Sequence, residues 1–168
     1  GLGATALDSF SVEFDATAPT SFDGVLTNSP AILSNVNIQG FAGNTGVGLR
    51  DTSAFPITVT SSTIQAFGTG IKVAHSSGAP AETWSNVSLT SNDLGLDISQ
   101  GSVAIANLAV QNSTGPGIRS SANGSPISLT LSGAGIQNNG LAGNGAPGIK
   151  WNGGSLYIAQ SSVSNNGG

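Results

Sequence analysis

Three columns of apolar residues recur along the chain at nearly constant intervals. The first column is spaced by 26, 25, 21, 26 and 27 residues, and its members are Leu33, Val59, Trp84, Ile105, Leu131 and Ile158. A second apolar residue follows each of these after five positions: Ile38, Ile64, Leu89, Val110, Ile136 and Val163. A third column starts with glycine in the pairs Gly48-Leu49, Gly70-Ile71, Gly95-Leu96, Gly117-Ile118 and Gly148-Ile149. Such periods are typical of solenoids, so the chain is predicted to stack about six coils.

Each repeat is expected to consist of short strands rather than helices. The chain contains 25 Gly and 7 Pro, which disfavour long helices. In parallel coils stacked about 4.8 Å apart, equivalent residues form ladders. Glutamine recurs directly after the second column at Gln39, Gln65, Gln111 and Gln137, and Asn92, Asn112, Asn138 and Asn165 follow where a corner is needed. The pattern therefore predicts an all-β fold, a right-handed parallel β-helix.

In these features the chain resembles the pectate-lyase-like superfamily of right-handed parallel β-helices. The resemblance covers residues 31–168 and depends on the coil length, the asparagines at turns and the Gly-Ile or Gly-Leu strand starts. That superfamily includes pectin-degrading enzymes, phage tailspikes, adhesins and fibre proteins, so the resemblance implies a fold without selecting a function.

The first 30 residues are predicted to lie apart from the β-helix of residues 31–168, because Leu2 to Leu26 does not fit the columns. This segment holds half of the acidic residues and no basic one, and its distinctive side chains are Phe10, Phe14, Phe22, Asp8, Glu13, Asp15 and Asp23. It is expected either to cap the first coil of its own chain or to provide a strand that docks on another copy.

All four basic residues occupy one position of the repeat, directly after the Gly-Leu or Gly-Ile pair. The column reads Arg50, Lys72, Asp97, Arg119 and Lys150, and the inward residue before each predicts that all five point outward. This stripe is either a solvated surface or a docking surface for an anionic partner. Together with Phe10, Glu13, Phe14, Asp15, Phe22 and Asp23 of the N-terminal segment, it forms the predicted assembly interface.

Catalysis, cofactor binding and metal binding are not expected. In the resembling lyases a solvent-facing strand carries calcium-binding Asp and a basic catalyst, but Asp93 and Asp97, with Lys72 and Arg119 nearby, make a poor match because calcium requires six to eight oxygen ligands. The single histidine, His75, has no evident partner and is interpreted as an ordinary loop residue. The net charge of −4 disfavours nucleic acid, and no run of 18 apolar residues could span a membrane.

The sequence favours a secreted protein acting at the cell surface. It lacks Cys and Met, and the small-residue opening over residues 1–4 fits the N-terminus left by signal-peptide cleavage. The expected function is a structural subunit of an extracellular filament or surface layer, in which copies assemble head to tail. The alternative is a carbohydrate- or host-surface-binding domain of an adhesin or tailspike, with extracellular polysaccharide as partner, and a polysaccharide lyase is the least favoured interpretation.

Overall fold

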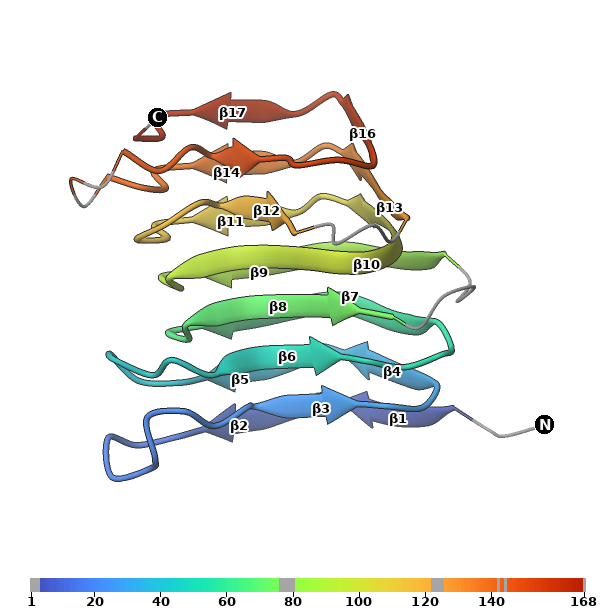
Figure 1. Cartoon of the computed structure of the whole chain (residues 1–168). Coiled ribbons are helices and arrows are strands. Elements are labelled where there is room, and N and C mark those ends of the chain that lie inside the picture. The colour runs from blue at the N-terminus through green and yellow to red at the C-terminus, as the bar shows by residue number, and fades with distance from the viewer. Residues whose placement is uncertain (1–3, 76–80, 122–125, 142, 144, 168) are drawn as a thin grey trace.

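The chain folds into a parallel β-helix of about six coils (Figure 1), which confirms the predicted all-β solenoid. The computed structural model describes residues 4–75, 81–121, 126–141, 143 and 145–167. Within these residues every ordered element is a strand, so no helix is present that could span a membrane. The first and last coils lie at opposite ends of the stack (Figure 1).

Each coil places strands at three positions around the axis, and neighbouring coils pair in parallel. The first position holds β1 (Thr5–Asp8), β4 (Ala31–Ser34), the beginnings of β7 (Ile57–Gln65) and β9 (Glu82–Thr90), the end of β10 (Leu94–Ala106), β13 (Ile127–Ser132) and β16 (Ser155–Ala159). The second holds β2 (Ser11–Glu13), β5 (Asn37–Gln39), the ends of β7 and β9, β11 (Ala109–Gln111), β14 (Gly135–Gln137) and β17 (Ser162–Ser164). The third holds β3 (Val25–Thr27), β6 (Val47–Asp51), β8 (Thr69–Ala74), the beginning of β10, β12 (Ile118–Ser120) and β15 (Ile149–Lys150).

The apolar columns of the sequence are the core of the stack. Leu33 pairs with Val59, and Ile38 pairs with Ile64, each in adjacent coils and each fully buried. The last members, Ile158 and Val163, occupy the same columns but remain 39% and 48% exposed. They belong to the last described coil, on which no further coil of the described residues is stacked.

Asparagines occupy two different roles at the corner after the second strand position. Asn112, Asn138 and Asn165 adopt positive φ angles of 58°, 57° and 53°, a conformation that asparagine tolerates better than most residues. The residue that follows Asn138 turns inward: Asn139 accepts a hydrogen bond from a backbone N–H of the preceding coil and donates one to the carbonyl of Val110. Asn92 takes this inward role, so its expected place in the turn ladder with Asn112 is corrected by one residue.

The N-terminal segment forms the first coil and does not lie apart from the columns. Leu7 pairs with Leu33, Val12 with Ile38 and Val25 with Leu49, through β1, β2 and β3. The expectation that this segment leaves the columns is therefore wrong over the described residues from Ala4 onward, while residues 1–3 lie outside the described part of the chain. The residue that continues the second apolar column is Val12. It lies between Phe10 and Phe14, which are the more prominent apolar residues in the sequence.

Candidate functional site

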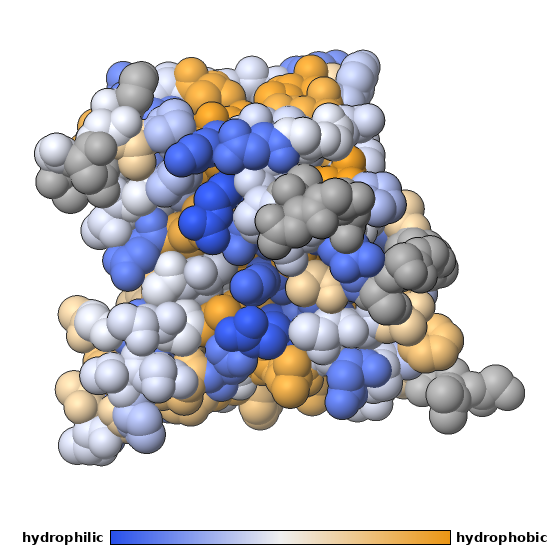
Figure 2. Space-filling view, viewed as in Figure 1, coloured by the Kyte–Doolittle hydropathy of each residue, from blue (hydrophilic) through white to orange (hydrophobic). Residues whose placement is uncertain are grey.

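The charged stripe exists in the predicted register along the third strand position. Arg50 pairs with Lys72, Lys72 with Asp97, Asp97 with Arg119, and Arg119 with Lys150. Figure 2 views the face that carries these strands, and hydrophilic side chains form a band along it. The repeat position alone was enough to predict that these residues are neighbours.

Asp97 departs from the prediction that the whole stripe points outward into solvent. It is only 2% exposed, and its two carboxylate oxygens accept hydrogen bonds from Arg119 Nε and Nη2 at 3.2 and 3.0 Å. Ser121 Oγ donates a third bond at 3.0 Å. Bidentate Arg–carboxylate pairs combine strength with fixed geometry. Asp97 therefore links two coils and lies buried beneath the side chain of Arg119.

Arg50 is also paired within the chain, with an acid that was predicted to dock on another copy. Arg50 Nε and Nη2 donate to Asp23 at 2.5 and 3.0 Å, and the backbone N–H of Val47 donates to the same carboxylate at 3.0 Å. The hydrogen bond from Arg50 lowers the pKa of Asp23 despite partial burial. This contact fastens the first coil to the second.

The other predicted interface residues of the first coil lie at its surface or edge. Phe10 is 42% exposed, Glu13 is exposed, and exposed Asp15 accepts a hydrogen bond from the Thr17 hydroxyl. Phe14 and Phe22 are half-buried against each other, with ring centroids 4.0 Å apart. Among the bases, Lys72 is half-buried and Lys150 is exposed. The structure thus leaves Phe10, Glu13 and Asp15 accessible on the first coil, whereas Phe14 and Phe22 are partly covered.

A buried cluster of Asp51, His75 and Glu82 lies at the corner that follows the third strand position. Asp51 ends β6, His75 directly follows β8, and Glu82 begins β9, so successive coils contribute one residue each. His75 Nε2 lies 2.5 Å from Asp51 Oδ2 and 3.1 Å from Glu82 Oε1. All three side chains are fully shielded from solvent.

The interpretation of His75 as a loop residue without partners is therefore wrong. Asp51 precedes His75 by 24 residues, which is about one coil, and this spacing was the available signal that the two lie together. Glu82 belongs to the cluster because it is the first residue of β9, the strand that starts at this corner. The separation of only seven residues from His75 does not match the coil period, so the repeat pattern could not predict it.

Backbone and hydroxyl groups hold both carboxylates of the cluster in place. Thr27 Oγ1 and the backbone N–H of Ser53 donate to Asp51 Oδ1 at 2.8 and 3.0 Å. The backbone N–H of Ile57 donates to Glu82 Oε1 at 2.9 Å. Glu82 Oε2 and His75 Nδ1 are buried without a hydrogen-bond partner among the described residues. Most buried polar atoms are satisfied, so these two call for a physical explanation.

The electrostatics of the cluster favour shared protons at neutral pH. Burial raises the pKa of Glu82 to about 7, and nearby Asp51 adds to this effect. Burial opposes protonation of His75, but hydrogen bonds to both carboxylates outweigh it and raise its pKa to about 9. Burial also opposes ionisation of Asp51, yet the hydrogen bond with His75 leaves its pKa below the ordinary value. The group can therefore hold protons or another cation between its oxygens.

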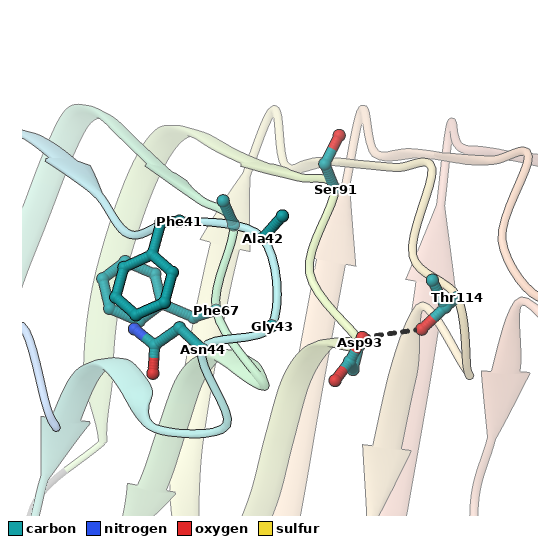
Figure 3. Close-up of a pocket in the computed structure, with 9 residues that line it drawn as sticks. Phe41, Ala42, Gly43, Asn44, Phe67, Ser91, Asp93 and Thr114 are labelled. Carbon is teal, nitrogen blue, oxygen red and sulfur yellow. Dashed lines mark hydrogen bonds between the residues drawn. The ribbon is translucent and has the colours of Figure 1, made fainter. Parts of the chain in front are cut away.

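A shallow groove of about 280 Å³ runs along the turns of four successive coils (Figure 3). Phe41 and Phe67 line one end of the groove, and Asp93 accepts a 2.8 Å hydrogen bond from Thr114 Oγ1 at the other. Asp93 thus lines a groove, whereas Asp97 is committed to Arg119 within the stripe. Asp93 and Asp97, the two acids compared with a lyase calcium site, therefore have different hydrogen-bond partners.

Comparison of the chain with protein-family models, with curated proteins and with solved structures gives no match.

Proposed function

We propose that this β-helix is a non-catalytic structural subunit of an extracellular filament or surface layer, in which copies stack head to tail. It also assumes that the chain is related to the structural members of the pectate-lyase-like superfamily. The observation that supports this proposal most is that the two end coils leave residues of the same apolar columns partly exposed to solvent.

The last described coil offers an apolar surface with unpaired strand edges. Ile158 and Val163 are 39% and 48% exposed, and Leu156 and Trp151 are half-buried beside them. β16 and β17 each pair with one preceding strand, and no described strand pairs on their other side. Exposed edges of this kind are templates for adding a further strand.

The first coil offers the complementary surface. Leu7, Val12 and Val25 stand at the start of the three columns and are half-buried. If a first coil were placed on a last coil with the coil-to-coil register maintained, Leu7 would lie on Ile158 and Val12 on Val163. Contacts between two different surfaces of identical subunits propagate into open assemblies. In this arrangement strand pairing and apolar burial drive association, and the internally paired stripe has a secondary role.

The test is a pair of substitutions on β16 that differ only in the direction of the side chain. Ile158→Lys places a charge on the exposed end of the column, whereas Tyr157→Lys places it on the lateral surface, where Tyr157 is 64% exposed. Neither position is buried, so both variants are expected to fold. Negative-stain microscopy and sedimentation velocity should show concentration-dependent fibres for wild type and for Tyr157→Lys, and loss of fibres for Ile158→Lys.

Two results would contradict this function. Wild-type protein that stays monomeric at millimolar concentration would eliminate the filament and favour the carbohydrate- or host-surface-binding alternative. Fibres that persist in Ile158→Lys would show that association uses a lateral surface and not the end coils.

A further inference from the structure

We propose that Asp51, His75 and Glu82 form a binding site for one divalent transition-metal ion, with Zn²⁺ the first candidate. The ligand atoms are imidazole Nε2 and one oxygen of each carboxylate, and they all lie within 4.8 Å of one another. This site is independent of the end-to-end assembly, because it is buried inside the stack.

The donor set suits a borderline metal ion better than a hard one. Zn²⁺ binds histidine nitrogen and carboxylate oxygen at about 2.0–2.2 Å, usually with four ligands. Ca²⁺ requires about six to eight oxygens, which one imidazole and two carboxylates cannot supply. The 2.5 Å between His75 Nε2 and Asp51 Oδ2 would widen as an ion enters between them.

Charge balance provides the second argument. Two buried carboxylates and a neutral imidazole carry a charge of −2, and a divalent cation makes the site neutral. Isolated buried charges are costly unless they are paired or coordinate a metal. Glu82 Oε2, fully buried and without a hydrogen-bond partner among the described residues, is the atom for which such an ion supplies a partner.

The surrounding bonds hold the carboxylates in a preorganised arrangement. Asp51 Oδ1 is occupied by Thr27 and Ser53, which leaves Oδ2 facing His75. Glu82 Oε1 is fixed by the Ile57 N–H, which orients the whole carboxylate. Such outer contacts orient metal ligands and raise affinity. An ion held here would connect three successive coils and stabilise their stacking.

The experiment uses the full chain without a histidine tag, treated with EDTA and then dialysed. Because His75 is the only histidine, its imidazole NMR signals need no assignment by mutation. Zn²⁺ and Co²⁺ are titrated by calorimetry and visible absorption, with Ca²⁺ for comparison. The expected result is one Zn²⁺ per chain, shifted His75 signals, a raised Tm and no response to Ca²⁺.

Glu82→Gln removes one anionic ligand but retains an acceptor for the Ile57 N–H, and Asp93→Asn is the matched control at an exposed acid. Affinity for Zn²⁺ should fall at least tenfold in Glu82→Gln and stay unchanged in Asp93→Asn. If Glu82→Gln does not fold, the site is tested by whether Zn²⁺ shifts the His75 signals of the wild-type protein. Absence of binding, binding that leaves the His75 signals unmoved, or equal affinity in folded Glu82→Gln would each overturn the site and leave a cluster that holds protons only.

Discussion

The second apolar column offers a matched pair of truncations, Val110→Ala and Val163→Ala. Both valines occupy equivalent positions, in β11 and β17, on either side of Ile136. Val110 is fully buried, whereas Val163 is 48% exposed. Removing two methyl groups at Val110 costs about 1.6 kcal/mol at about 0.8 kcal/mol each. The cavity adds about 1 kcal/mol, and Gly95, which lies against Val110 Cγ1, has no side chain to fill it.

The free energy of unfolding should therefore fall by about 2–3 kcal/mol in Val110→Ala and by less than about 1 kcal/mol in Val163→Ala. Urea denaturation of dilute, unassembled protein, followed by circular dichroism, measures both values. Equal losses at the two sites would refute the coil assignment. The comparison is then repeated under conditions in which fibres form. Stacking of copies would bury Val163, so Val163→Ala should weaken the fibres.

Three further predictions concern the polar groups. Asp97→Asn should lower the free energy of unfolding by about 1–2 kcal/mol through loss of the charged bond with Arg119, while Asp93→Asn should change it little in the same denaturation assay. In EDTA-treated protein the His75 imidazole should titrate by NMR near pH 9. Since this pKa is raised on folding, its stabilisation is complete below about pH 6.5 and disappears as the pH rises through 9. The Asp23 pKa is lowered on folding, so its stabilisation should disappear as the pH falls below about 4, and Asp23→Asn should remove that part of the acid dependence. A His75 imidazole that titrates near pH 6.5 would contradict the first of these two assignments. An Asp23→Asn variant that loses stability at acid pH as wild type does would contradict the second.

The coil register could be predicted from sequence because it depends on a repeated physical requirement. Every coil must bury apolar residues against its neighbours, so Val59 and Ile64 recur as Ile105 and Val110 with the same offset. The neighbours in the stripe, such as Lys72 and Asp97, followed from the same register. What the register does not determine is how far each side chain extends, and this is why burial of Asp97 was missed.

The remaining errors arose where contacts run between positions of the repeat. Asp51 and His75 both follow the third strand position, but Asp51 pairs with Val73, so His75 lies two residues beyond the matching position. Glu82 begins β9 and so belongs to the first strand position. The repeated columns alone therefore do not predict such a cluster. The first coil was missed for a different reason, since Phe10 and Phe14 are more conspicuous than Val12, the residue that pairs with Ile38.

Several polar side chains bind groups of the preceding coil, and this has a consequence for assembly. Arg50 reaches back to Asp23, Arg119 reaches back to Asp97, and Asn139 binds the backbone of the preceding coil. A first coil stacked on the end of another copy has Leu26 at the stripe position of Arg50, so it brings no base to that contact. The junction between copies would then depend on strand pairing and apolar burial alone. It should be weaker than any coil contact within the chain, so that fibres dissociate on dilution before the subunits unfold.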